Sequence, residues 1–183
     1  MATKVAMMQI NSEFSGQWYL PYASGLLESY AKKHLPYPER YEFATPIFRR
    51  EKVADIVGKL KESDLLGTTL YSWNEQLSLQ SIEKLKREKP SILAVCGGPQ
   101  VPRAERPWEI EAFHRKYPFI DLLVHGAGEK PFLEILKSGL GGNWETLPSV
   151  SFVKSGGEFV KTAQAADLKD LDETPDPFLT GVF

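Results

Sequence analysis

The sequence Ser91-Ile-Leu-Ala-Val-Cys-Gly-Gly-Pro-Gln-Val101 contains the boundary that decides the fold of this chain. Its apolar run, Ile92 to Cys96, stops abruptly at Gly97-Gly98-Pro99, which is typical of a buried strand that ends in a loop. In an open α/β sheet, ligands bind outside the carboxyl ends of the strands, where such loops meet. The glycine pair also has a purely structural explanation, because glycine readily adopts the positive φ of a tight turn. The rest of the sequence has to decide between the two.

Four more apolar segments of strand type alternate with helical patterns. These segments are Lys4 to Ile10, Tyr41 to Ile47, Leu65 to Tyr71 and Asp121 to His125. The spacing i, i+3, i+4, i+7 of Val53, Ile56, Val57 and Leu60 predicts one of the intervening helices. Repeated βαβ units predict an α/β fold, a doubly wound five-stranded parallel sheet with helices on both faces. Of the common strand orders, the flavodoxin-like (Rossmann-like) order 2-1-3-4-5 suits five strands best.

The pattern changes after Gly142. Val150 to Val153 and Phe159 to Lys161 flank a Gly-rich turn and predict a β-hairpin. We therefore divide the chain into an α/β domain at residues 1–142, a hairpin extension at 143–166 and a linker at 167–183. The apolar last residues suggest that a further domain follows the linker in a larger protein.

Local signals give further expectations about single residues. Ser72 or Asn74 is expected to cap the helix after the third strand, since Ser72-x-x-Glu75 fits a capping box. Gly25, inside the first helix, is expected to permit close packing on the sheet. His34 is expected near a helix C-terminus and His114 on a solvated helix face.

Composition excludes several classes of function. A net charge of −2 gives no support to binding of nucleic acid or of an anionic membrane, because both require a basic face. Cys96 is the only cysteine, so neither a disulfide nor a thiolate metal site is expected, and no residue is assigned to a metal. The first residues are too short a run for a signal peptide or a membrane span, and we expect a cytoplasmic protein.

Loops at the predicted carboxyl edge of the sheet supply the candidate cofactor site. Glycines there allow a large flat ligand to approach the backbone, and Trp73 offers an aromatic face. Neither the G-x-G-x-x-G fingerprint nor a Walker-type Gly-Lys-Ser/Thr is present, so a dinucleotide or P-loop site is not expected. His125 ends the fifth strand at this edge, with either a structural or a binding role. The candidates are Asn11, Ser12, Gly16, Thr69, Tyr71, Ser72, Trp73, Gly97, Gly98, Pro99, His125, Gly126, Gly128 and Glu129.

Three segments at the ends of predicted strands carry a family resemblance. They read Leu-Leu-Gly-Thr-Thr-Leu-Tyr-Ser-Trp-Asn at 65–74, Cys-Gly-Gly-Pro-Gln-Val at 96–101 and Asp-Leu-Leu-Val-His-Gly-Ala-Gly-Glu at 121–129. In this order they resemble the cobalamin-binding N-terminal domain of radical S-adenosylmethionine proteins. The terminal segment 171–180 also resembles the linker that leads to the radical domain of that family.

The resemblance implies roles for individual residues. Thr69 would face the dimethylbenzimidazole tail of cobalamin, Tyr71 would line the same slot, and Gly97 and Gly98 would make room for it. Gly126, Gly128 and Glu129 match the fifth-strand motif of the family, with Ala127 in place of its usual glutamate.

One departure from the family pattern concerns the cobalt atom. Many cobalamin domains carry Asp-x-His-x-x-Gly after the first strand, whereas this chain reads Asn-Ser-Glu-Phe-Ser-Gly at 11–16. The resemblance therefore implies a corrinoid held without a protein histidine ligand to cobalt.

The resemblance also implies a function. The chain would present the corrinoid to the radical domain of the parent polypeptide, which would hold S-adenosylmethionine and an iron–sulfur cluster and carry out methyl transfer. We do not expect this chain alone to be catalytic. The alternatives are a degenerate docking domain that binds no corrinoid, and a flavodoxin-like domain for a flavin or another nucleotide.

Overall fold

The computed structural model describes residues 2–183, and a seven-stranded sheet of order β4-β1-β5-β6-β7-β8-β9 lies at its centre. The first five strands in this order run parallel, so the predicted parallel sheet with order 2-1-3-4-5 is confirmed. The strands are β1 (Thr3–Met8), β4 (Tyr41–Phe43), β5 (Leu65–Thr69), β6 (Leu93–Gly97), β7 (Leu122–Val124), β8 (Val150–Val153) and β9 (Phe159–Lys161).

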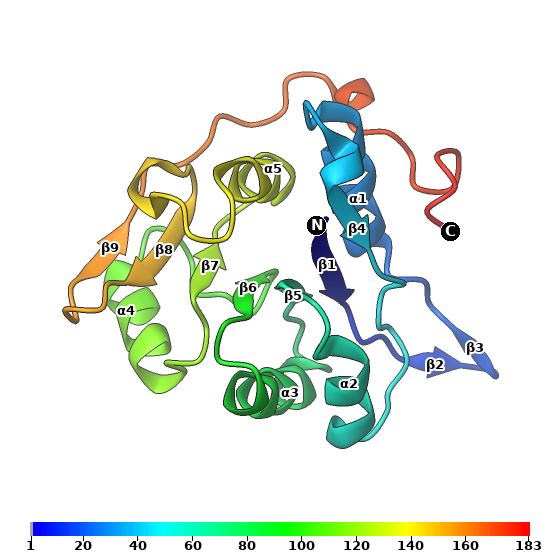
Figure 1. Ribbon diagram of the computed structural model, residues 1–183, viewed down its shortest axis with the longest axis horizontal. Helices are drawn as coiled ribbons and strands as arrows, with labels where there is room; N and C mark the ends of the chain where they lie inside the picture. Colours follow the sequence, from blue (N-terminus) through cyan, green and yellow to red (C-terminus); the bar gives the residue numbers. More distant parts are fainter. Residues whose placement is uncertain (1) are drawn as a thin grey trace.

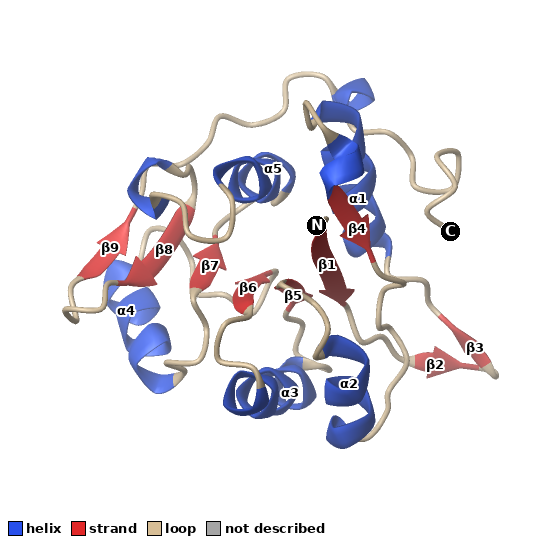
Figure 2. Ribbon diagram, in the orientation of Figure 1, coloured by secondary structure: helices blue, strands red, loops and turns tan. Residues whose placement is uncertain are grey.

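Helices cover both faces of the sheet, as the repeated βαβ pattern predicts (Figures 1 and 2). They are α1 (Tyr22–His34), α2 (Val53–Leu60), α3 (Glu75–Glu88), α4 (Pro107–Lys116) and α5 (Glu129–Ser138), with single 3-10 turns at Pro38–Arg40, Trp144–Thr146 and Leu171–Glu173. α1 and α5 pack side by side on one face, and α2 and α3 on the other. Each face has its own apolar core, because successive side chains of a strand point to opposite faces.

The predicted C-terminal hairpin forms and becomes part of the main sheet. β8 pairs antiparallel with β7, and β9 pairs antiparallel with β8. A second, much shorter hairpin, β2 (Glu13–Phe14) and β3 (Gln17–Trp18), occupies the loop after β1 and projects from the body of the molecule (Figure 1).

The start of α3 differs from the capping box in the sequence. The helix begins at Glu75, and no side chain caps it. Asn74 precedes the helix, but its Oδ1 accepts a hydrogen bond from the backbone N–H of Tyr71 instead. The prediction that Ser72 caps this helix is therefore wrong, because the loop before α3 uses Asn74 to close a turn of its own.

The last residues of the chain lie along α1 (Figure 1). Phe183 packs so closely on Gly25 that a Cβ atom there would come within 2.5 Å of its ring. Thr180 and Ser29 share a hydrogen bond of 2.9 Å between their hydroxyl groups. The expectation that Gly25 permits packing on the sheet is thus wrong: the space left by its missing side chain is used by the segment that was expected to be an extended linker.

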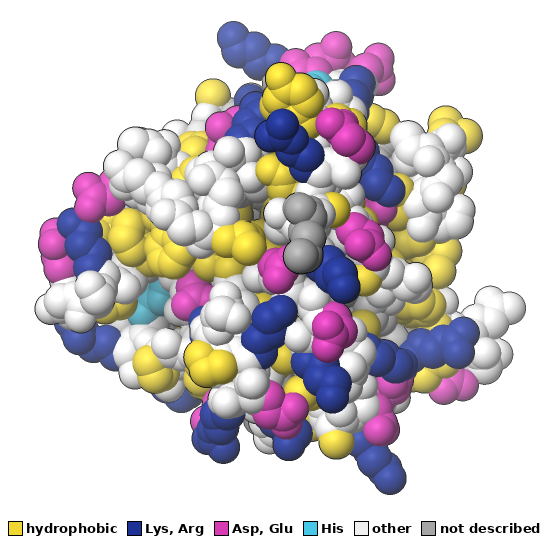
Figure 3. Space-filling model, viewed as in Figure 1, with side chains coloured by type: hydrophobic (Ala, Val, Ile, Leu, Met, Phe, Trp, Pro, Cys, Tyr) yellow, Lys and Arg dark blue, Asp and Glu magenta, His cyan; other side chains and the backbone are white. Residues whose placement is uncertain are grey.

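One face of the molecule mixes charges of both signs. On the face in Figure 3, Lys and Arg side chains are interspersed with Asp and Glu. Among the helices of residues 2–183, none has both the length and the apolar character that a membrane crossing requires.

Candidate functional site

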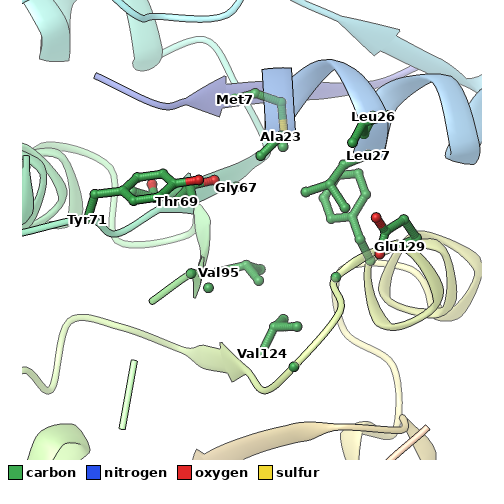
Figure 4. A pocket seen from close by; sticks show the side chains of 16 residues that line it. Met7, Ala23, Leu26, Leu27, Gly67, Thr69, Tyr71, Val95, Val124 and Glu129 are labelled. Atoms are coloured by element: carbon green, nitrogen blue, oxygen red, sulfur yellow. The ribbon is translucent and has the colours of Figure 1, made fainter. Parts of the chain in front are cut away.

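A cavity of about 180 Å³ lies between the sheet and the pair of helices α1 and α5 (Figure 4). It opens at the carboxyl ends of the parallel strands, where the switch in strand order between β1 and β5 separates the loops. Apolar side chains from both layers form most of its wall. They are Met7, Val95 and Val124 from the strands, Ala23, Leu26 and Leu27 from α1, and Phe132 from α5.

Glycines keep this cavity open. At Gly98, where φ is +99°, a Cβ atom would lie 2.8 Å from the backbone oxygen of Leu70 and 2.9 Å from Cγ2 of Thr69. At Gly67, in the middle of β5, a Cβ atom would lie 2.8 Å from Sδ of Met7. All three distances are shorter than van der Waals contact. Gly98 is thus required by backbone conformation and also by the space beside Thr69, whereas a Cβ atom at Gly97 would make only ordinary contact with Val124, at 3.6 Å.

The loop from Leu70 to Asn74 is fixed at both of its ends. The backbone N–H of Leu70 donates to the Gly97 carbonyl at 2.8 Å, which continues the β5–β6 pairing beyond the strands. Asn74, which is fully buried, donates through Nδ2 to the carbonyls of Ile10 and Thr69 at 3.0 and 3.1 Å. Between these anchors Tyr71 and Trp73 stack, with ring centroids 4.5 Å apart and planes 10° apart. The loop therefore presents a rigid aromatic pair at the carboxyl edge.

Thr69 and Glu129 bring polar side chains to the largely apolar wall of the cavity. Thr69 is 9% exposed, at the carboxyl end of β5. Oε2 of Glu129, at the start of α5, is buried and has no hydrogen-bond partner within residues 2–183. An unpaired buried polar atom is costly, so the carboxylate of Glu129 marks where a ligand has a hydrogen bond to make.

The loop after β1 borders a neighbouring groove of about 400 Å³. Asn11 is held in place by hydrogen bonds from Nδ2 to the carbonyls of Tyr19 and Leu20, at 2.9 and 3.1 Å. The groove is lined by Gln9, Asn11, Ser12, Tyr19, Leu20, Tyr71 and Trp73. Tyr71 also lines the cavity, so the two spaces meet at its ring.

His125 belongs to a buried polar cluster with Ser151 and His114. Nε2 of His125 lies 2.9 Å from Oγ of Ser151, and Nε2 of His114 lies 3.0 Å from the same oxygen. Burial lowers the pKa of each imidazole to about 4, so both rings are neutral at pH 7. The expectation that His114 lies on a solvated helix face is wrong, because α4 turns this residue towards β8, and only 3% of it is exposed.

His125 also borders a groove of about 620 Å³ that adjoins the cavity at Gly98, Val124 and Gly126. Pro99, Arg103 and Gln164 lie on the same groove. This groove and the previous one extend the site on both sides of the cavity along the carboxyl edge.

The candidate residues thus fall into four groups. The first lines the cavity: Thr69, Tyr71, Gly97, Gly98, Gly126, Gly128 and Glu129. Asn11, Ser12 and Trp73 line the groove after β1, whereas Pro99 and His125 line the groove beyond Gly98. Gly16, in the turn between β2 and β3, and Ser72 line none of these spaces. The apolar residues of α1 and α5 were not among the candidates, because their helical spacing is that of ordinary core residues.

Comparison with known proteins gives a consistent family. A search of protein-family models finds no match. The chain is 35% identical over 166 residues to the cobalamin-dependent radical SAM methyltransferase TokK of Streptomyces tokunonensis. It is 34% identical over 166 residues to a 2-(S-pantetheinyl)-carbapenam-3-carboxylate methyltransferase of Streptantibioticus cattleyicolor. Each match covers 90% of this chain, which spans about a quarter of the length of the curated relatives.

Solved structures show the same fold. The cobalamin-dependent S-adenosylmethionine radical enzyme OxsB with aqua-cobalamin bound superposes on 99% of this chain with a TM-score of 0.69, at 16% identity, over 25% of its own length. The same enzyme with aqua-cobalamin and S-adenosylmethionine gives a TM-score of 0.67 at 15% identity. Together with the sequence matches, this shows that the chain is homologous to the N-terminal quarter of cobalamin-dependent radical SAM methyltransferases.

Proposed function

We propose that this chain binds a corrinoid at the carboxyl edge of its sheet and presents it to the radical domain of a methyltransferase. The observation that carries the proposal is the cavity beside β5 and β6, whose shape depends on Gly67 and Gly98. The relatives named as cobalamin-dependent supply the identity of the ligand class. A flat aromatic base with a sugar attached suits a narrow apolar slot that ends in a few polar groups.

The residues of the cavity fit the nucleotide tail of such a cofactor. The apolar wall from α1, α5 and the strands would bury the aromatic base, which contributes most of the binding free energy. The Thr69 hydroxyl would donate to a ring nitrogen of that base. Gly98 would let the tail pass close to the backbone, since a side chain there would collide with Leu70 and Thr69 at the rim of the cavity.

The corrin ring would lie over the loops at the carboxyl edge. Tyr71 and Trp73 offer a stacked aromatic surface there, and Trp73 is 47% exposed. When bound, the corrinoid supplies a cobalt atom that can carry a methyl group. The chain's own part is to bind the tail, orient the ring and exclude water from the face that the loops cover.

We further propose that no histidine of this chain binds the cobalt atom. The loop from Asn11 to Gly16 contains none, and Glu13 stands where the family motif has histidine. His114 and His125 share the Ser151 hydroxyl instead. His34 lies at the end of α1, where its Nε2 is 3.0 Å from the carbonyl oxygen of Glu173.

The radical chemistry would take place outside this chain. Its only cysteine, Cys96, is completely buried in β6, and burial raises the pKa of the thiol. A cluster held by three cysteines therefore requires residues beyond this sequence. S-adenosylmethionine, the cluster and the methyl acceptor are assigned to the remainder of the whole protein.

Titration of the purified chain with hydroxocobalamin tests the proposal. We expect the corrinoid to co-elute with the protein on a sizing column at micromolar concentration, with a visible spectrum that lacks the features of histidine coordination. Flavin mononucleotide, tested by equilibrium dialysis, should not bind. Failure of hydroxocobalamin to co-elute would contradict the proposal, whereas retention of the flavin would favour the nucleotide-binding alternative.

A docking domain that binds no corrinoid is the second candidate. The observation that favours it is the short hairpin in place of a histidine-bearing loop, with Phe14 69% and Tyr19 62% exposed. If the chain bound the separately produced radical domain while binding no corrinoid, this candidate would replace the first.

A further inference from the structure

The carboxylate of Glu129 is the charged group in the wall of the cavity. Figure 4 shows its side chain pointing from α5 towards the cavity, close to Leu27 of α1. Oε2 is buried and has no hydrogen-bond partner among residues 2–183. The surrounding wall is largely apolar, so a carboxylate oxygen here loses its hydrating water without gaining a hydrogen bond from the protein.

Neighbouring side chains of α5 do not compensate Glu129. Lys130 donates to the carbonyls of Ala166 and Asp167 at 2.9 and 3.2 Å, which directs it away from the cavity. Lys137 pairs with Glu134 at 2.9 Å. The start of a helix favours a carboxylate, but through a weak and diffuse field that leaves Oε2 without a donor.

Thr68 provides a useful contrast. Its Oγ1 is also buried and unpaired, and the residue also borders the cavity. Its partners in the parallel register are Met8 and Cys96, which belong to the core on the α2 and α3 face. The Thr68 hydroxyl therefore points away from the cavity, and Glu129 is left as the unpaired acceptor on the cavity side.

Taking the proposed corrinoid function as given, we infer that Glu129 accepts a hydrogen bond from the nucleotide tail of the corrinoid and makes the site selective for that tail. Two parts of a tail can donate. A ribose hydroxyl is present whatever the base, whereas an exocyclic amine is present in an adenine base and absent from dimethylbenzimidazole. The chemistry that Glu129 recognises is the same in both cases: a neutral O–H or N–H donor beside an aromatic base.

The test compares three corrinoids on the purified chain by titration of the visible spectrum. Cobalamin carries the ribose hydroxyl, a cobamide with adenine as its base carries that hydroxyl and an amine, and cobinamide lacks the nucleotide altogether. The variants are Glu129→Ala and Glu129→Gln, with Glu134→Ala as the matched control on the same helix outside the cavity. Thermal unfolding of each variant without ligand reports any effect on the fold.

Loss of a hydrogen bond to a charged acceptor is expected to weaken cobalamin binding about 10- to 100-fold in Glu129→Ala. Glu129→Gln keeps an acceptor oxygen and is expected to lose less. Cobinamide affinity should stay within about twofold of the original protein, as should every affinity of the Glu134→Ala control. An equal loss for cobalamin and the adenine cobamide would identify the ribose hydroxyl as the donor, and a larger loss for the adenine cobamide would show that the base amine donates in addition.

Two results would overturn the inference while leaving corrinoid binding intact. One is an unchanged affinity of Glu129→Ala for cobalamin. The other is an equal loss for cobalamin and cobinamide, which would mean that Glu129 only supports the fold. If the unmodified chain bound none of the three corrinoids, the proposed function would fail as well.

Discussion

The side-chain amide of Asn74 is joined to Ile10 by a hydrogen bond of 3.0 Å from Nδ2 to the backbone carbonyl. The same nitrogen donates to the Thr69 carbonyl at 3.1 Å, and Oδ1 accepts from the N–H of Tyr71 at 2.9 Å. One buried side chain thus ties the segment after β1 to the end of β5, on either side of the switch in strand order. The position of Tyr71 in the candidate site depends on this link.

Replacing Asn74 with Asp should destabilise the fold substantially. A carboxylate of the same shape cannot donate to Ile10 and Thr69, and each unsatisfied carbonyl costs about 1–3 kcal/mol. We expect the free energy of unfolding in urea to fall by about 2–5 kcal/mol. Asn143→Asp is the control, since Asn143 only accepts a bond, from Glu145 N–H. Similar losses in the two variants would contradict the role assigned to Asn74.

Gly98→Ala should displace Thr69 and Leu70 beside the cavity as well as strain the backbone. Its new Cβ would lie 2.8 Å from the Leu70 oxygen, whereas at Gly157, with φ of +84°, a Cβ would meet nothing within 4 Å. Gly157→Ala therefore isolates the backbone cost of roughly 1–2 kcal/mol. We expect Gly98→Ala to lose more stability than this and to bind cobalamin at least tenfold more weakly. Equal affinities of the two variants would remove Gly98 from the proposed site.

Thr69→Val and Thr68→Val form a matched pair on opposite faces of one strand. Thr69→Val keeps the size of a side chain in the cavity wall and removes its hydroxyl, so stability should change by less than about 0.5 kcal/mol while cobalamin binding weakens about 5- to 10-fold. Thr68→Val removes a buried unpaired hydroxyl. It should leave cobalamin binding unchanged, and the free energy of unfolding should stay the same or increase. Titration and urea unfolding of both variants give the comparison. Weaker binding in Thr68→Val would show that the assigned faces are wrong.

The cluster of His114, Ser151 and His125 should make stability depend on pH. Below pH 6.5 the unfolded chain binds protons that the folded chain takes up only near pH 4, so the free energy of unfolding should fall as pH falls through this window. The difference between the histidine pKa in the unfolded and in the folded chain corresponds to roughly 3 kcal/mol of unfolding free energy for each histidine. His114→Gln should lower the loss between pH 7 and pH 4.5, as measured by urea unfolding. An unchanged loss in His114→Gln would contradict this account.

Most of the fold was predictable because it depends on local sequence. Apolar runs that end in glycine, such as the one before Gly97, indicate buried strands, and their alternation with helical spacing fixes the parallel order. The failures depend on contacts made across long stretches of chain. His114 was placed on a solvated face from its neighbours Arg115 and Lys116, but its partner, Ser151, comes from a strand 37 residues later.

Which residues lie together at the carboxyl edge was predictable for the same physical reason. Strand ends meet at one edge of a parallel sheet, so Thr69, Gly98 and Glu129 could be grouped before their positions were known. The sequence did not indicate that Asn74 links the segment after β1 to the end of β5, because an asparagine before a helix is usually a cap. Nothing in the sequence indicates that Leu27 and Phe132 line a cavity, since the wall of a ligand slot has the composition of an ordinary core.

Helix α1 separates the cavity from the end of the chain. Leu26 and Leu27 face the cavity, while Gly25 and Ser29, on another side of the same helix, contact Phe183 and Thr180. The slot and the terminal segment are therefore one helix diameter apart, with no flexible loop between them. A displacement of the terminal segment would therefore be transmitted to the proposed cofactor site by movement of α1 as a rigid body.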